Sequence, residues 1–374
     1  MFLVFGCTAV VGMVLLVFTL TSPHYNGESS YAGAEAQAAE EAIARPQGRA
    51  QAPLSLEAPP LSLGVGGDVT FGLAVADVIA SEGTAYPWTD ISPLFGAYEI
   101  IAVNMEGPLC RDDIPASVQS SVCLRGDASC AAPMADAGID AVCLANDHIM
   151  DYGTAGLEET LNVLRAEGLA SFGAGCNLVA AERPLVLEAE NGAKVAMVSF
   201  CDVSSPAREA GDDTPGIAGL SLERIGETIG AAETDAHYTV VLAHWGEVGS
   251  QEITQRQREI AKACVDAGAD LVVGYHPHVV QGIELIEGVP VIYSLGNLVF
   301  SPESETGKSA IFVGCRFNGG GLTGLEIVPL DVDGGKPVPL SGERAVDVLN
   351  YLKTASPGVD FDMSPVTGTA NIML

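Results

Sequence analysis

Short apolar runs alternate with helix-like segments from residue 61 onward, and this alternation restricts the fold more than any other feature of the sequence. In Gly156–Gly168 and again in Glu252–Gly268, apolar residues recur at helical spacing and a glycine ends the segment. Strands that alternate with helices are typical of an α/β fold, in which helices cover the faces of sheets. The candidate strands are Leu61–Gly66, Glu99–Val103, Asp140–Ala145, Lys194–Phe200, Tyr238–Ala243, Asp270–Val273, Val289–Ser294, Ala310–Phe317 and Leu322–Leu330, the last two joined as a hairpin.

Two histidines one residue apart, His276 and His278, follow the apolar run Asp270–Val273. In an extended segment, residues i and i+2 point to the same side. Two imidazoles that point together from the end of a strand form half of a metal site. The pair therefore predicts a metal site that side chains from elsewhere in the chain would complete.

Polar residues also follow five other candidate strands. Glycines at Gly66–Gly67 would allow a sharp turn from which Asp68 projects. At each position alone, an ordinary turn or a solvated side chain is an alternative. The carboxyl ends of strands in an open α/β sheet converge on one crevice, so the six motifs together indicate a single site. The candidates after the other four strands are Asn104 and Glu106; Asn146, Asp147, His148 and Asp151; His244; and Asn297.

The mixture of carboxylates and imidazoles sets the expected chemistry. Such ligands suit a divalent metal, Mn²⁺, Fe or Zn²⁺, as one ion or two. Two ions a few ångströms apart can clamp a phosphoryl group. His148 would be a general acid for a leaving oxygen, and Asp151 is the second candidate catalytic residue.

Acidic side chains outnumber basic ones 48 to 17, which gives a net charge of −31. Such a charge repels nucleic acid, so we expect no nucleic-acid partner. A strongly negative charge suits cation binding, although an acidic composition common to proteins of the same lineage is the simpler explanation. Cys110, Cys123 and Cys130 lie in one loop-like segment, and the sequence leaves open whether two of them form a disulfide.

The first 60 residues differ in character from the rest. Residues 1–20 carry no charge and are long enough to cross a bilayer as a helix, so we predict a single-pass membrane anchor over residues 1–21. A cleaved signal peptide is the alternative, although its usual basic start is missing. Either places the main domain outside the cytoplasm. Residues 22–60 predict a flexible Ala/Glu/Pro-rich linker, residues 61–332 the main domain, and residues 333–374 a C-terminal extension with a helix over Ser341–Leu352.

Six segments carry a family resemblance. GDVTFG, NMEGP, LANDHIMDYG, HWGE, GADLVVGYHPHVVQGIE and VIYSLGNLVF, in this order, resemble the bacterial poly-γ-glutamate capsule-synthesis proteins of the CapA/PgsA type, within the calcineurin-like metallophosphoesterase superfamily. The match covers about Leu61–Leu330. It implies a four-layer metallophosphoesterase-like sandwich of two mixed β-sheets flanked by helices. It also implies an N-terminal membrane helix and a role in making or exporting capsule polymer, with synthesis or export partners.

The resemblance also implies a role for each motif residue. It places the metal ligands at Asp68, Glu106, Asn146 or Asp147, His244, His276 and His278, and leaves Asn104 and Asn297 to contact the substrate or orient a ligand. Two positions depart from the superfamily pattern: Thr70 stands where a histidine is common, and Asp147 where an asparagine is common. They support metal binding better than catalysis. A true metal-dependent phosphoesterase and a non-catalytic binding module on the same fold remain alternatives.

Overall fold

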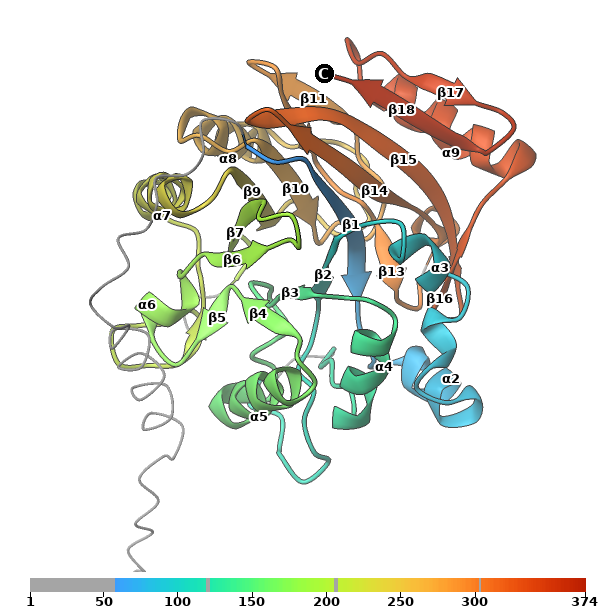
Figure 1. The fold of residues 1–374 in the computed structure, drawn as a ribbon. Coiled ribbons are helices and arrows are strands. Elements are labelled where there is room, and N and C mark those ends of the chain that lie inside the picture. Colours follow the sequence, from blue (N-terminus) through green and yellow to red (C-terminus); the bar gives the residue numbers. More distant parts are fainter. Residues whose placement is uncertain (1–57, 119–121, 205–207, 303) are drawn as a thin grey trace, which may run out of the picture. The chain divides into compact units, whose positions relative to one another are not determined.

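The computed structural model describes residues 58–374 except 119–121, 205–207 and 303 (Figure 1). All of these residues belong to one compact unit. Among them, no helix is both long and apolar enough to cross a bilayer. The predicted anchor at residues 1–21 and nearly all of the predicted linker at residues 22–60 lie outside the described residues.

The larger of two mixed sheets has ten strands, in the order β17-β18-β15-β14-β1-β2-β3-β4, with β13 beside β1 and β16 beside β15. Strands β2 and β13 pair with β1 in parallel, whereas β14 pairs with it antiparallel. The strands are β1 (Leu61–Val69), β2 (Ile100–Met105), β3 (Ala141–Cys143), β4 (Ala170–Phe172), β13 (Asn297–Val299), β14 (Ser309–Asn318), β15 (Gly321–Asp333), β16 (Lys336–Pro339), β17 (Asp362–Ser364) and β18 (Thr369–Met373).

The second sheet has six strands in the order β11-β12-β10-β9-β7-β6, and a pair of short strands, β5 and β8, lies apart from both sheets. Strands β7, β9, β10 and β12 run parallel to one another. The strands are β5 (Ala174–Gly175), β6 (Leu185–Glu188), β7 (Lys194–Cys201), β8 (Gly216–Ile217), β9 (Tyr238–His244), β10 (Leu271–Tyr275), β11 (Ile283–Ile286) and β12 (Val289–Ile292).

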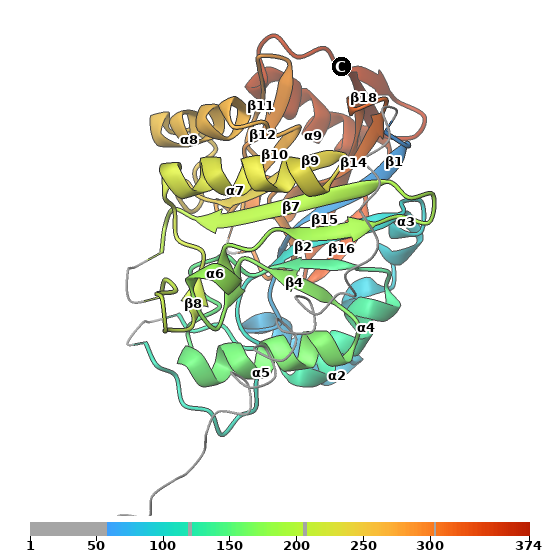
Figure 2. The ribbon, with the colours of Figure 1, turned by 60° about the vertical axis from the view of Figure 1, so that its left-hand side comes forward.

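Helices cover the outer faces of the sheets. Figure 2 shows α7 and α8 side by side along the six-stranded sheet, where Ile229 and Ile260 join its buried core. On the ten-stranded sheet, Phe95 of α3 packs on Phe312 of β14. The helices are α2 (Ala74–Glu82), α3 (Ser92–Phe95), α4 (Ala131–Asp136), α5 (Gly153–Ala166), α6 (Leu178–Ala181), α7 (Leu222–Asp235), α8 (Gln255–Asp266) and α9 (Gly342–Ala355), with 3₁₀ turns at Tyr86–Trp88, Ala128–Cys130 and Thr306–Lys308.

The two sheets meet through their side chains. The rings of Tyr238 in β9 and Phe317 in β14 lie 4.7 Å apart, and the thiol of Cys143 in β3 lies 2.8 Å from the hydroxyl of Ser199 in β7. The predicted α/β fold with two mixed sheets flanked by helices is therefore confirmed.

The predicted elements match the structure closely. Every candidate strand is present, the predicted hairpin joins β14 to β15, and the predicted last helix is α9. Residues after 332 continue the ten-stranded sheet, because β16 and β18 both pair with β15. Cys110 and Cys130 are free thiols, so no disulfide joins two of the three cysteines that share that segment.

The glycine pair before Asp68 has a different purpose from the one expected. Gly66 and Gly67 lie inside β1 and form no sharp turn, so that interpretation is wrong. A Cβ atom on Gly67 would lie 2.1 Å from the carbonyl oxygen of Gly296. The glycines are therefore needed because β13 approaches β1 so closely, which sets Asp68 directly beside Asn297.

Two aspartates, Asp140 and Asp270, each lie directly before one strand and accept a hydrogen bond from the neighbouring parallel strand. Asp140, before β3, accepts a hydrogen bond from the amide of Ile101 at 2.8 Å. Asp270, before β10, accepts one from the amide of Thr239 at 2.7 Å. Burial outweighs these hydrogen bonds and raises the pKa of both carboxyls, that of Asp270 to about 6. Each aspartate thus aligns two parallel strands at the end opposite the polar motifs.

Replacing Asp270 by asparagine is expected to change how stability depends on pH. An acid whose pKa is raised by folding loses stability as pH rises from its unfolded value near 4 through its folded value of about 6. The D270N protein lacks this loss, so between pH 4 and pH 7.5 it should gain roughly 1–3 kcal/mol relative to wild type. Thermal melts across this pH range measure the effect. D360N, at an exposed loop aspartate, is the control, and parallel wild-type and D270N curves would contradict the assignment.

Candidate metal centre

The carboxyl ends of strands from both sheets converge on one group of polar side chains. From the ten-stranded sheet come Asp68 in β1 and Glu106 just after β2. From the six-stranded sheet come His244, the last residue of β9, and the pair after β10. Asp68, Glu106 and His244 are at most 1% exposed. The convergence predicted from the sequence is therefore present, although it spans two sheets.

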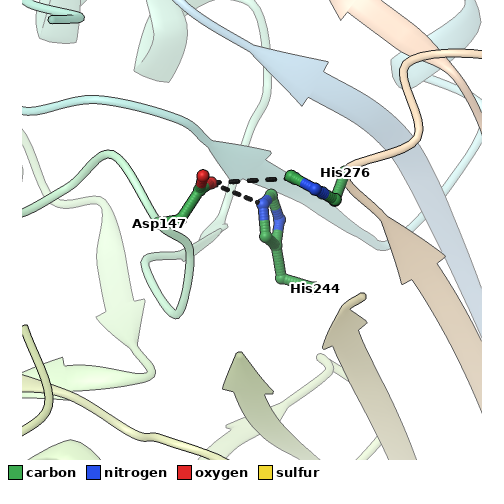
Figure 3. Close-up of side chains that lie close together, drawn as sticks. All are labelled: Asp147, His244 and His276. Atoms are coloured by element: carbon green, nitrogen blue, oxygen red, sulfur yellow. Dashed lines mark hydrogen bonds and ion pairs between the residues drawn. The ribbon is translucent and has the colours of Figure 1, made fainter. Parts of the chain in front are cut away.

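Asp147, His244 and His276 form the first group that could hold a metal ion. Figure 3 shows the three side chains pointing toward one another, from the loop after β3, the end of β9 and the loop after β10. The Oδ1 atom of Asp147 lies 3.0 Å from Nε2 of His244 and 3.7 Å from Nδ1 of His276. One carboxylate and two imidazoles thus face a common point.

Two further groups adjoin the first. Asp68, Glu106 and His244 form one, and Glu106, Asp147 and His148 form the other. His278 lies against both of the carboxylates in the first of these, with its Nδ1 atom 3.4 Å from Asp68 and its Nε2 atom 3.5 Å from Glu106. Because Glu106, Asp147 and His244 each belong to two groups, the cluster offers adjacent positions for one divalent cation or two.

The histidine pair reaches this cluster by an unexpected route. Strand β10 ends at Tyr275, and the backbone φ angles of His276 and His278 are 92° and 57°. The extended alternation expected from the sequence is therefore wrong. Non-glycine residues adopt positive φ rarely and at an energetic cost, most often at functional sites. A strained turn, rather than a strand, brings the two imidazoles to the cluster.

The protonation states of the histidines differ. Burial and the neighbouring ring of His244 lower the pKa of His276 to about 3, so this ring is neutral, the form in which an imidazole can bind a metal. Burial would also lower the pKa of His278, but the charges and hydrogen bonds of Glu106 and Asp68 outweigh it and raise that pKa well above its ordinary value. In the metal-free protein, His278 thus carries the positive charge that balances these buried carboxylates.

The donor set fits a divalent cation. Among the described residues, no lysine or arginine pairs with Asp68, Glu106 or Asp147. Two buried atoms at the centre, Oε2 of Glu106 and Nδ1 of His276, have no hydrogen-bond partner. Buried polar atoms are rarely left without a partner, and carboxylate and imidazole donors are what first-row divalent metals bind. His276 and Glu106 belong to different groups of potential ligands, so cations held by those groups would give each atom a partner.

The three asparagines at the centre support other residues. Asn104 donates to Asp68 at 2.7 Å, and Asn297 holds His278 through its ring nitrogen and its carbonyl oxygen. Both amide ends of Asn146 are engaged: its nitrogen donates to the carbonyl of Met105 and its oxygen accepts the amides of His148 and Ile149. Of the two ligands that the sequence left open, the geometry therefore favours Asp147.

His148 and Asp151 form a hydrogen-bonded dyad beside the cluster. The Nδ1–H of His148 donates to Oδ2 of Asp151 at 2.7 Å. Burial would lower the pKa of His148, but Asp151, Asp147 and Glu106 together raise it. The guanidinium of Arg208 lies 3.4 Å from the other carboxylate oxygen of Asp151. Sequence reasoning missed Arg208, because it follows no apolar run and belongs to no motif.

Thr70 takes no part in the cluster. It occupies the position where a histidine is common in the superfamily pattern, is 1% exposed, and its hydroxyl accepts a hydrogen bond from the amide of Gly72. Of the described histidines, only His237 lies away from the centre, where it accepts the amide of Lys194. The other four converge at the cluster together with Asp68, Glu106, Asp147 and Asp151.

Comparison with known proteins points to one family. The family model "Bacterial capsule synthesis protein PGA_cap" matches residues 62–302. The chain is 31% identical to the PGA biosynthesis protein CapA of Bacillus subtilis, over 75% of this chain and 74% of that protein. It is 30% identical to the capsule biosynthesis protein CapA of Bacillus anthracis, over 75% and 70% respectively. Among solved structures, NAD nucleotidase of Haemophilus influenzae shows 17% identity and a TM-score of 0.44; the match covers 80% of this chain but under two thirds, 64%, of that one.

Proposed function

Because this chain belongs to the PGA_cap family of bacterial capsule synthesis proteins, we propose that it acts in the synthesis or export of a poly-γ-glutamate capsule polymer through a divalent metal centre. The observation that carries the proposal is the convergence of four imidazoles on Asp68, Glu106 and Asp147, which no lysine or arginine of the described chain neutralises. The proposed ligands of Mn²⁺, Fe or Zn²⁺ are Asp68, Glu106, Asp147, His244, His276 and His278. A bound divalent metal would neutralise the carboxylates and attract an anionic group.

The proposed place of action is the outer side of the cell membrane. The uncharged apolar run at residues 1–20 supports an anchor for the main domain. Enzymes or transporters of the polymer would be partners at that surface. A net charge of −31 disfavours long-range attraction of a polyanionic chain unless cations screen it. We therefore assign the metal centre to one step in the synthesis or export of the polymer, and not to general binding of the polymer over the protein surface.

A second function, hydrolysis of a phosphate ester, is favoured by the dyad of His148 and Asp151. His148 lines a cleft of about 540 Å³ beside Glu106, and its raised pKa favours the protonated ring that a general acid requires. Asp151 fixes Nδ1, so Nε2 is the atom that would donate a proton to a leaving oxygen. If the protein hydrolyses phosphate esters, H148A should lower turnover of a simple phosphate ester by at least about 100-fold.

The proposed function is tested by complementation of a capsule-forming bacterium whose own family member has been deleted. The full chain should restore surface polymer, and the H276A/H278A variant should not, because metal binding requires both rings. H237A is the matched histidine control outside the centre. Unchanged polymer with H276A/H278A would overturn the proposal. Purified proteins are assayed in parallel with a chromogenic phosphate ester, so that polymer loss without hydrolysis separates the first function from the second.

A further inference from the structure

The cleft beside the metal centre has a mainly apolar lining, with its charged and amide side chains at the centre and two serines, Ser301 and Ser304, elsewhere. The side chains at the centre are Glu106, His148, His278 and Asn297. Most of the remaining wall is apolar, formed by Leu73, Leu124, Val248, Val279, Phe300 and Pro302 among others. A site with a few convergent polar groups and an apolar wall binds a ligand that has one polar end and an apolar body.

Apolar side chains are exposed at the rim of this cleft. Leu73 is 46% exposed and Val248 is 65% exposed, although both are large hydrophobic residues. Leu73 also holds a φ angle of 55° with ψ of −140°, a conformation that strongly favours glycine. The strained backbone projects a leucine side chain where it lines the cleft. Exposed apolar surface gathered at a cleft is a mark of a binding site.

The apolar wall is continuous with the metal centre. The ring of Phe300 lies 4.5 Å from the ring of His278, measured between centroids, and Phe300 is itself buried. A ligand whose anionic group sits at the metal would therefore have its next atoms against Phe300. The exposed apolar residues Leu73 and Val248 line the same cleft as Phe300.

The charges around the cleft restrict the polar end of the ligand. Among the described residues that line it, none is a lysine or an arginine, and the carboxylate of Glu106 lies at its polar end. An anion would therefore sit at the metal centre, and a second charge further along the ligand would meet the mainly apolar wall. This excludes a segment of a polyanionic polymer, which carries a charge on every unit, and favours a single anionic head with an uncharged body.

We propose that the cleft binds a phosphate ester of an apolar alcohol, with the phosphate at the metal centre and the alkyl chain along Phe300, Leu73 and Val248. This inference rests on the proposed metal centre and adds the substrate class to it. A phosphate offers several oxygens to adjacent cations, which suits a cluster with more than one position. A carboxylate on the same chain is the alternative head, and the experiment separates the two.

The experiment measures how affinity depends on chain length. The full chain is loaded with Mn²⁺, and methyl, butyl and octyl phosphate are titrated by calorimetry below the concentration at which octyl phosphate forms micelles. Burial of each methylene should tighten binding about twofold or more, so octyl phosphate should bind at least about 50-fold more tightly than methyl phosphate. Octanoate should bind much more weakly than octyl phosphate.

Variants of the rim residues Leu73 and Val248 test where the alkyl chain of the ligand lies. L73G/V248S should reduce the octyl-to-methyl affinity ratio at least about fivefold. Glycine suits the backbone of Leu73, and both side chains are exposed, so this variant should melt no lower than wild type. V179S, at a valine that is 74% exposed and does not line the cleft, should leave the ratio unchanged.

Each result decides a different point. If the protein binds metal and methyl phosphate but shows no chain-length dependence, the inference is overturned while the metal centre stands. An unchanged ratio in L73G/V248S, or octanoate binding as tightly as octyl phosphate, would also overturn it. If the protein binds no metal, the proposed function fails first.

Discussion

Alanine at both His276 and His278 is expected to remove the divalent metal from the purified full chain. The two imidazoles contact three of the carboxylates at the centre, Asp147, Asp68 and Glu106. Loss of a group that only orients a ligand costs 10- to 100-fold in metal affinity, so loss of two ligands should cost on the order of 1,000-fold or more. Elemental analysis after dialysis and a competitive metal titration measure the effect.

A single substitution separates metal loss from misfolding in this experiment. His276 has a φ angle of 92°, and its Nδ1 atom has no hydrogen-bond partner. H276G relieves the backbone strain and removes this partnerless atom, so the metal-free variant should melt no lower than H276A. It should nevertheless bind metal far more weakly than wild type. H237A should keep a wild-type metal content, and metal retained at full stoichiometry in H276A/H278A would contradict the assignment of the ligands.

The strand ends could be predicted from the sequence because two simple patterns agree there. A short apolar run defines each strand, and the polar residue directly after it falls at the carboxyl end, as Glu106 does after β2. Since parallel strands bring their carboxyl ends to one edge, Asp68, Glu106, His244 and the histidine pair could be grouped before any distance was known. The order of apolar runs and polar residues along the chain was therefore enough to predict which of these residues lie in the cluster.

The local geometry of the same residues could not be predicted, since it depends on contacts between distant segments. The positive φ angles of His276 and His278 are imposed by the surrounding structure and have no signature in the sequence. The need for Gly67 comes from Gly296, more than two hundred residues later in the chain. Arg208 approaches Asp151 from a segment with no motif. The sequence thus identified side chains that the fold brings together, whereas the fold determines how each one is held.

Gly274→Ala is expected to destabilise the protein severely. Gly274 lies in β10, where an added Cβ atom would be 2.0 Å from the carbonyl oxygen of Tyr293 and 2.4 Å from Nε1 of Trp245. These two groups share a buried hydrogen bond of 2.9 Å, and both side chains are fully buried. Overpacking costs about 1–3 kcal/mol and a broken buried hydrogen bond about as much again. The sum, roughly 2–6 kcal/mol, is a large part of the stability of an ordinary domain.

The control substitution, G230A, is expected to change the free energy of unfolding in the opposite direction. Gly230 lies in α7, is exposed, and has nothing within 4 Å of an added Cβ atom. G230A should therefore stabilise the protein by about 0.5–1 kcal/mol, because alanine favours a helix over glycine. Denaturant unfolding of the two variants and the wild type measures both effects.

The G274A result also bears on the metal centre. The segment that carries Gly274 continues into His276, and Trp245 directly follows His244, a proposed metal ligand. Any shift of β10 away from Tyr293 moves these two imidazoles relative to Asp147, so metal affinity should fall along with stability. A G274A protein as stable as wild type would show that β10 and Tyr293 do not approach so closely. The relative positions of His244 and His276 would then have to be explained by other contacts.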